Sequence, residues 1–255
     1  AEIIRLAAQS LSAAGLNKYK LCIGNVEFFR GLCEELKFDR ETELALRDYV
    51  SNKNFVGAKE YMNSLGLSED KQNKILAIND FVGGVESLNS ALEMANNDRS
   101  KAAINRLIDL YKCIDECGLA DCIFFDLGLL SKYNYYTGMI FKGYAFGNGD
   151  AIVKGGRYDS LLGKFGKPSS AVGFVFLVDD IMTALSTQGL LPDAALEETW
   201  IVYSEANKSA AINKAKDMRS NNQSVALISF DTTKSTKDYE DYAAKNDISK
   251  VEFML

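Results

Sequence analysis

Hydrophobic residues recur at helical spacing through most of the first half of the chain. A first helix is expected over residues 1–14, where apolar positions three and four apart share one face. The same period runs from residue 26 to 118 without strand-like alternation, so this block is predicted to consist of helices. Asn25, Asp39 and Ser68 precede three of the helical stripes and are the expected N-cap residues.

Short apolar or alternating runs predict strands on both sides of this block. They are expected at residues 19–24, 121–127, 139–146, 151–154 and 171–178. The tetrapeptide Gly-Asn-Gly-Asp at 147–150 is typical of a hairpin turn between the third and fourth of these runs. A helix is predicted to follow the last run, over residues 179–187.

The period changes after a linker-like segment at residues 188–198. Strands are predicted at 200–203, 224–229 and 250–253, and helices at 207–219 and 235–244. A β-α-β-α-β order favours a small α/β unit with parallel strands. We therefore expect two domains, at residues 1–188 and 198–255.

Composition and charge narrow the class of protein. The 255 residues are 47% hydrophobic and 25% charged, with a formal net charge of −6, as in ordinary folded proteins. An acidic balance makes tRNA an unlikely partner, because phosphate contacts supply most nucleic-acid affinity. No run approaches the roughly 20 apolar residues of a membrane span. We expect a cytoplasmic location, and the absence of a starting Met suggests a piece of a longer chain.

The chemistry available to the chain is limited, because it contains no histidine. This excludes mechanisms that use an imidazole base. The chain has five cysteines, and Cys113, Cys117 and Cys122 come close together in the sequence. Their spacing is not that of a usual zinc site, so we interpret them as buried small hydrophobic residues. No metal and no cofactor are expected.

Three motifs in the second half carry most of the functional information. They are YYTGMIF at 135–141, KGGRYDSLLGKFG at 154–166 and AVGFVFLVDDIM at 171–182. Adjacent glycines let the backbone approach a ligand closely, and tyrosines offer a flat wall with a hydroxyl that suits an imidazole. The competing interpretation is that the aromatic residues are sheet core and that GGRYD is a tight turn.

In order and spacing these motifs resemble the histidyl-tRNA synthetase family. The resemblance implies an α+β fold: a class II aminoacyl-tRNA synthetase-like antiparallel sheet with a helical insertion, here 26–118. The small C-terminal α/β domain resembles a shortened anticodon-binding domain. By resemblance Tyr136 and Tyr158 would bracket a histidine ring. The implied histidine-binding residues are Tyr135, Tyr136, Thr137, Gly155, Gly156, Arg157 and Tyr158.

Departures from the family pattern affect the positions that handle ATP. The family has an arginine where this chain has Ser131, and an E-R pair where it has Asp179 and Asp180. A carboxylate in place of a phosphate-binding cation repels the phosphate. The upstream segment IGNVEFFRGLCEEL resembles the branch of the family that regulates ATP phosphoribosyltransferase. The resemblance therefore favours a regulatory subunit that has no catalytic residues.

That branch implies its own set of partners. We expect a short-form ATP phosphoribosyltransferase catalytic subunit as the partner, histidine as the effector, and homo- and hetero-oligomers. The function would be to sense histidine and control the first step of histidine biosynthesis. Two alternatives stay open: a divergent histidyl-tRNA synthetase or its catalytic fragment, and a synthetase-like interaction module that binds neither histidine nor ATP.

Overall fold

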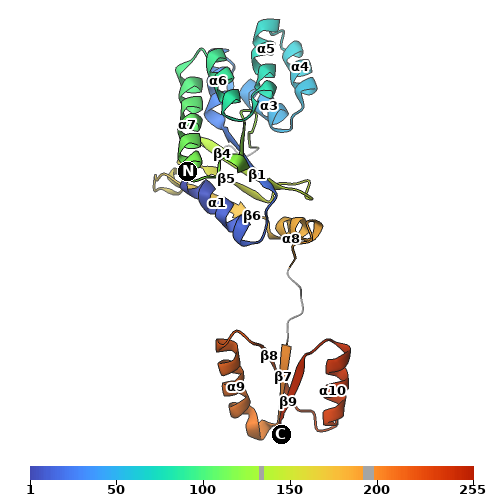
Figure 1. Cartoon of the computed structure of the whole chain (residues 1–255). Coiled ribbons are helices and arrows are strands. Elements are labelled where there is room, and N and C mark those ends of the chain that lie inside the picture. The colour runs from blue at the N-terminus through green and yellow to red at the C-terminus, as the bar shows by residue number, and fades with distance from the viewer. Residues whose placement is uncertain (132–134, 192–197) are drawn as a thin grey trace. The chain divides into compact units, whose positions relative to one another are not determined.

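The computed structural model describes residues 1–131, 135–191 and 198–255 (Figure 1). The chain divides into two compact units, Ala1–Leu191 and Pro192–Leu255. The end of the first unit lies between the expected domain limits at 188 and 198. Over the described residues, no helix is both long and apolar enough to cross a membrane.

A six-stranded sheet forms the centre of the first unit, in the order β2-β3-β1-β4-β5-β6. The strand β1 pairs parallel with β3 and antiparallel with β4, and the remaining pairs are antiparallel. The sheet is thus mainly antiparallel, as expected. The strand bounds are β1 Tyr19–Asn25, β2 Val82–Gly83, β3 Ile123–Asp126, β4 Met139–Ala145, β5 Val153–Arg157 and β6 Val172–Phe176.

Helices occupy most of the segment between β1 and β3. Asn25 and Asp39 cap α2 and α3 through side-chain oxygens that accept from Glu27 N and Thr42 N, as predicted. Ser68 precedes α5 but makes no capping bond. The prediction of uninterrupted helix is wrong at β2, which is only two residues long and pairs with β3. The helices are α2 Val26–Glu35, α3 Arg40–Ser51, α4 Phe55–Ser64, α5 Glu69–Leu76, α6 Val85–Met94 and α7 Asp98–Asp115.

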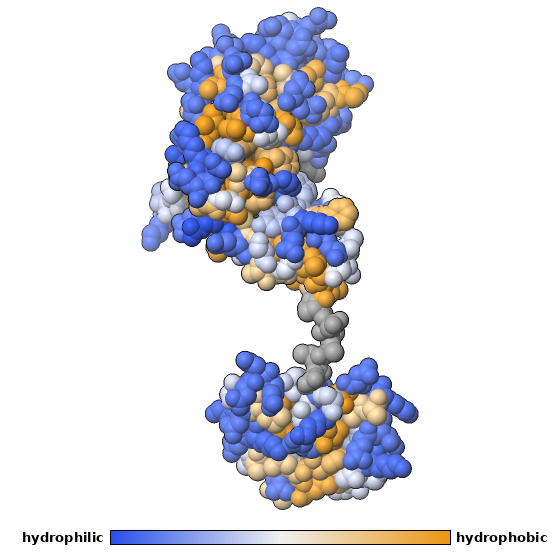
Figure 2. Space-filling model, viewed as in Figure 1, coloured by the Kyte–Doolittle hydropathy of each residue, from blue (hydrophilic) through white to orange (hydrophobic). Residues whose placement is uncertain are grey.

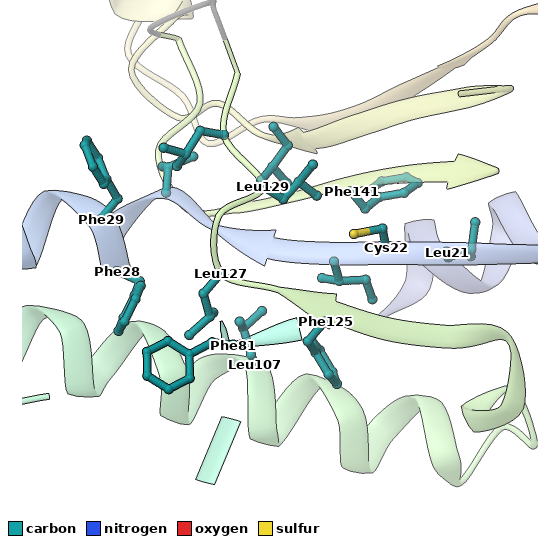
Figure 3. Packing of buried hydrophobic residues seen from close by; sticks show 14 of the residues in the cluster. Leu21, Cys22, Phe28, Phe29, Phe81, Leu107, Phe125, Leu127, Leu129 and Phe141 are labelled. Atoms are coloured by element: carbon teal, nitrogen blue, oxygen red, sulfur yellow. The ribbon is translucent and has the colours of Figure 1, made fainter. Parts of the chain in front are cut away.

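Two further helices belong to the first unit: α1 Glu2–Ala13 and α8 Val178–Thr187. One continuous core joins the sheet to α1 and to the helical block. Phe28 of α2, Phe81 and Leu107 of α7 lie together in Figure 3, and the rings of Phe28 and Phe81 meet edge to face at 6.2 Å. The outward surface of the block that is visible in Figure 2 is mostly hydrophilic. This separation of faces is what the helical hydrophobic period predicts.

The hairpin expected at 147–150 is present between β4 and β5. The strand after it differs from the prediction, which ended it at residue 154. β5 extends to Arg157, so Gly155 and Gly156 are paired strand residues and not part of a tight turn. Glycine is a poor strand former, and only the close packing on both faces explains two of them here.

The second unit has a three-stranded parallel sheet, as predicted from its element order. β7 Glu198–Tyr203 lies between β8 Ser224–Ser229 and β9 Lys250–Met254. The helices α9 Lys208–Ser220 and α10 Thr236–Lys245 flank the strands on either side (Figure 1). Its small core contains Ile201, Ala211, Ala215 and Val225.

The cysteines are free thiols in the structure, and their burial differs from the prediction. Cys113 and Cys117 are exposed on and just after α7, so the interpretation as buried hydrophobic residues is wrong for both. Cys122 is half-buried. Residues i and i+4 share one helix face, and here that face is the solvent side.

Candidate functional site

The register of the β4–β5 hairpin decides which side chains share a face of the sheet. Ile140 lies opposite Gly156, and Lys142 lies opposite Lys154. Paired residues point to the same side, and successive residues point to opposite sides. These four residues therefore lie on one side of the sheet, which we call the tyrosine face because three tyrosines pack on it.

The opposite side of the same strands is the core face, which carries Phe141, Gly155 and Phe174. Phe141 is fully buried, and its ring lies 6.1 Å from that of Phe174. The helix α1 contacts β6 and contributes buried Ile4 and Leu11 to the same core. Around Gly155 this side is therefore filled by packed side chains.

Three tyrosines form a cluster on the tyrosine face. The ring centroids of Tyr135 and Tyr136 are 4.3 Å apart, and Tyr158 meets Tyr135 at 6.0 Å and Tyr136 at 6.4 Å, both edge to face. Tyr136 is only 8% exposed, and its burial raises the pKa of its hydroxyl. The hydroxyl is therefore neutral at physiological pH and can both donate and accept a hydrogen bond.

Two glycines make room for these rings. A Cβ atom on Gly156 would lie 2.6 Å from Cε1 of Tyr136, and one on Gly173 would lie 2.5 Å from Oη of Tyr158. Real Cβ atoms do not approach other atoms so closely. The motifs YYTG, GGRYD and VGF thus fit together, because Gly156 leaves the space that Tyr136 fills and Gly173 leaves the space that Tyr158 fills.

Asp159 connects the other predicted residues, although the sequence analysis did not single it out. Its carboxylate accepts from Nε of Arg157 at 2.6 Å and from the backbone N of Ala171 at 3.0 Å. Its own backbone N donates to Oγ1 of Thr137 at 3.0 Å. The Arg157 guanidinium lowers the pKa of Asp159. This network fixes the segment before β4 against the end of β5.

The predicted site residues are divided between two cavities. A cavity of about 360 Å³ on the tyrosine face is lined by Tyr135 and Tyr136. Another, of about 590 Å³, is lined by Thr137 and Arg157 together with Asn25, Glu27, Arg99, Arg106 and others. Neither cavity is lined by Gly155, Gly156 or Tyr158. Gly156 lies against the ring of Tyr136, and Gly155 faces the core.

Lys142 and Lys154 also line the tyrosine-face cavity, and the sequence analysis missed them. They are direct cross-strand partners on the same face. The sequence held a signal for this pair, because one lysine precedes the predicted hairpin turn and the other follows it. It could not be used without the register, since a shift of one residue would place them on opposite faces.

The three positions that depart from the family pattern lie in two parts of the first unit. Ser131 lines the tyrosine-face cavity. Asp179 and Asp180 lie in the first turn of α8, where carboxylates are favourable for the helix dipole. Asp180 also accepts from Nδ2 of Asn148 at 3.1 Å, and so holds the hairpin turn to α8.

The geometry suits binding of a small polar aromatic molecule. The tyrosine-face cavity has an apolar aromatic wall, hydroxyl groups and two ammonium groups, and no carboxylate is among its described lining residues. Over the ranges that the structure describes, no three cysteine or carboxylate side chains gather as metal ligands would. These groups can pack against a ring and pair with polar or charged groups of a ligand.

Comparison with known proteins agrees with the fold and the motifs. A family model described as histidyl-tRNA synthetase matches residues 1–181. A protein of Ruminiclostridium cellulolyticum named ATP phosphoribosyltransferase regulatory subunit is 32% identical over 251 residues, which are 98% of this chain and 59% of that protein. A protein of the same name from Thermoanaerobacter pseudethanolicus is 34% identical over 237 residues, 92% of this chain and 62% of that protein.

Solved structures give the same result. A structure from Bacillus halodurans, named ATP phosphoribosyltransferase regulatory subunit/histidyl-tRNA synthetase, superposes with a TM-score of 0.78 at 28% identity over 99% of this chain and 63% of that one. Histidyl-tRNA synthetase from a Nostoc species has a TM-score of 0.73 at 17% identity over 96% of this chain and 60% of that one, and shares the fold. The predicted class II synthetase-like fold and the resemblance to the regulatory branch are confirmed. The chain spans about three fifths of the length of these curated relatives.

Proposed function

Because this chain belongs to the histidyl-tRNA synthetase family, we propose that it is part of a regulatory subunit of ATP phosphoribosyltransferase that senses histidine and controls the first step of histidine biosynthesis. The observation that carries the proposal is the similarity, over 98% of the chain, to a protein with that regulatory name. Fold alone would not suffice, since one fold serves many functions.

The seven predicted residues form the proposed histidine site, with different duties. Tyr135 and Tyr136 provide the aromatic wall of the cavity, and Tyr158 packs against both of them. Gly156 allows Tyr136 to lie close to the strand. Tyr136 and Tyr158 touch edge to face, so a bracketed ring would need them to move apart. The remaining residues (Gly155, Thr137 and Arg157) act by packing and by holding the segment that carries the tyrosines.

The proposal includes the absence of amino-acid activation. The family resemblance assigns Asp180 to the position of a phosphate-binding arginine, and its carboxylate here accepts from Asn148. A carboxylate at this position opposes binding of a phosphate. We expect no histidine-dependent ATP–pyrophosphate exchange by the complete gene product, and exchange at ordinary enzyme concentration would overturn the regulatory proposal.

The proposed partner is the short-form catalytic subunit of ATP phosphoribosyltransferase, in a hetero-oligomer in the cytoplasm. A subunit without chemistry of its own acts by binding an enzyme and shifting its conformational equilibrium, and its effector must favour one state. The complete gene product should therefore co-purify with the catalytic subunit and raise its activity, and histidine should reverse this.

Substitutions of the tyrosine cluster separate effector binding from assembly. Tyr136→Ala and Tyr158→Ala should weaken inhibition by histidine while the complex still forms, since the tyrosine cluster packs beside a cavity and Tyr136 is largely buried. Unchanged inhibition in both variants would refute the assignment of the site. Failure of the two subunits to associate would refute the function itself.

A divergent histidyl-tRNA synthetase is the second candidate, because the Bacillus halodurans protein carries both names. Specific binding of histidine tRNA at physiological salt, together with exchange activity, would favour it. An interaction module that binds neither ligand is distinguished by thermal unfolding. A ligand at about 100 times its dissociation constant stabilises by about 2.7 kcal/mol, so no shift with histidine would favour the module.

A further inference from the structure

Lys142 and Lys154 form a pair of like charges with no counterion in the described part of the chain. They lie directly opposite each other on β4 and β5 and line the same cavity. Among the described residues, no carboxylate lies within 4.0 Å of either ammonium group. Like charges at directly opposed strand positions are destabilising. Nothing in the fold of this hairpin requires them.

The groups around Lys142 do not neutralise it. Cys22 lies opposite it on β1, and burial raises the pKa of that thiol to about 12, so it is uncharged at neutral pH. Asp126 is on the same face of β3, but its carboxylate is taken by Lys53, with Nζ at 2.6 Å from Oδ2 and 2.8 Å from Oδ1. Burial, and then the neighbouring Lys154, lower the pKa of Lys142. An anionic ligand would stabilise the charged form of this half-buried lysine, which has no partner within 4.0 Å among the described carboxylates.

We infer that Lys142 and Lys154 bind the carboxylate of the effector amino acid, whose ring lies against Tyr135 and Tyr136. This inference rests on the proposed function. It adds that the carboxylate of the effector is recognised at the lysine end of the cavity and the ring at the tyrosine end. The cavity of about 360 Å³ is in the size range of small-molecule sites. An ammonium group and a carboxylate form a charge-assisted hydrogen bond, which is stronger than a neutral one.

The inferred arrangement also predicts selectivity for a ligand that carries a carboxylate. A molecule with the same ring but without a carboxylate would fill the aromatic end and leave both lysines unpaired. Such a site disfavours the analogue, because the half-buried ammonium group of Lys142 then lacks a partner. Histidinol, in which an alcohol replaces the carboxylate, is therefore the discriminating probe.

The test compares histidine and histidinol by calorimetry on the complete gene product. The unsubstituted protein should bind histidine roughly tenfold or more tightly than histidinol, as expected for loss of a hydrogen bond to a charged group. The double variant Lys142→Gln/Lys154→Gln should lose this preference while histidinol binding is unchanged. Lys142→Arg should keep it, since the charge remains.

Two further variants control for charge and folding. Lys164→Gln removes the same charge at an exposed position outside the cavity and should leave the preference intact. If the double variant does not fold, the single variant Lys154→Gln is used in its place, since Lys154 is at an exposed strand position. It should show a reduced preference for histidine over histidinol.

The possible failures are distinguishable. If histidine binds and the double variant keeps the full preference over histidinol, the inference is overturned and the proposed function stands. If the complete gene product neither binds histidine nor responds to it in the assembled complex, both are overturned.

Discussion

The two faces of β5 differ in what fills the space beside adjacent glycines. On the core face, a Cβ atom on Gly155 would lie 2.5 Å from Cε1 of Phe141 and 2.5 Å from Cβ of Phe174. On the tyrosine face, one on Gly156 would lie 2.6 Å from Cε1 of Tyr136. The first space is closed by fixed neighbours in a packed core. The second is covered by a ring that borders a cavity and, at 2.7 Å, by the backbone carbonyl oxygen of Met139.

This difference assigns separate duties to residues that look alike in the sequence. Packed interiors transmit any added volume as strain, whereas an aromatic side chain at a cavity can turn away. Substitutions on the core face should therefore lower the free energy of unfolding. A substitution on the tyrosine face that meets only the end of a tyrosine side chain, as at Gly173, should mainly change ligand binding.

The largest effect is expected for Gly155→Ala. The added methyl group would meet two aromatic residues and the carbonyl oxygen of Gly173 at 2.7 Å, so the strands themselves would have to move. Overpacking of this kind costs about 1–3 kcal/mol or more, and we expect the upper end of that range. Urea unfolding of the purified variant measures it.

The matched control is Gly149→Ala in the β4–β5 turn, where a Cβ atom would meet nothing within 4 Å. It should change the free energy of unfolding by less than about 0.5 kcal/mol. Equal stability of Gly155→Ala and the unsubstituted chain would contradict the description of the core face.

A smaller loss, about 2 kcal/mol, is expected for Asp126→Ala. This carboxylate is only 7% exposed and accepts from Lys53 Nζ and from the backbone N of Gly128, at 2.8 Å each. Hydrogen bonds to a charged group contribute about 1.5–3 kcal/mol when one partner is lost. Such a loss would show that the contact of Asp126 with Lys53, which joins the segment after α3 to the sheet, stabilises the fold.

Asp109→Ala is the control for that experiment. Its pair with Lys112 spans one turn of α7 and is exposed on both sides. Exposed pairs contribute about 0.2–1 kcal/mol, so chemical unfolding should detect little change. If both aspartate variants lost the same stability, burial would not be the cause.

Gly173→Ala should alter binding more than stability. The Cβ atom would lie 2.5 Å from Oη of Tyr158, and the next atom is 3.5 Å away, so only the end of one side chain must shift. We expect a loss below about 1 kcal/mol in urea unfolding. Calorimetry should show weaker histidine binding, because Tyr158 contacts both other tyrosines of the cluster. A stability loss as large as that of Gly155→Ala would remove the distinction between the faces.

Most elements could be predicted from the sequence because their signals are local. The hairpin at 147–150 and the caps at Asn25 and Asp39 depend on residues a few positions apart, and the structure has all three. The two-residue β2 has no period to detect and exists only because it pairs with β3. The exposure of Cys113 was missed because helical spacing does not say which face is buried.

The site was harder to predict, because it depends on register and on packing between strands. Tyr158 and Gly173 are close in the sequence, but their contact follows from the pairing of β5 with β6. The division of Thr137 and Tyr136 between two cavities also follows from the turn before β4, which no period describes. Lys142 and Lys154 become neighbours only once the hairpin register is known.

The smallest effect concerns acid stability and Asp159, which holds the segment before β4 against the end of β5. Arg157 lowers the pKa of this carboxyl in the folded chain, so the folded state binds the proton less readily than the unfolded state. Its contribution to stability is therefore fully present above the unfolded pKa of about 3.9 and is lost as the pH falls through the lower folded value. Asp159→Asn should lower stability at pH 7 and have little effect near pH 2.5, with a total change well below that of Asp126→Ala. Urea unfolding at both pH values measures it, with the exposed Asp80→Asn as control. A loss that was equal at the two pH values would show that the Asn side chain disturbs packing and that the charge of Asp159 does not stabilise the fold.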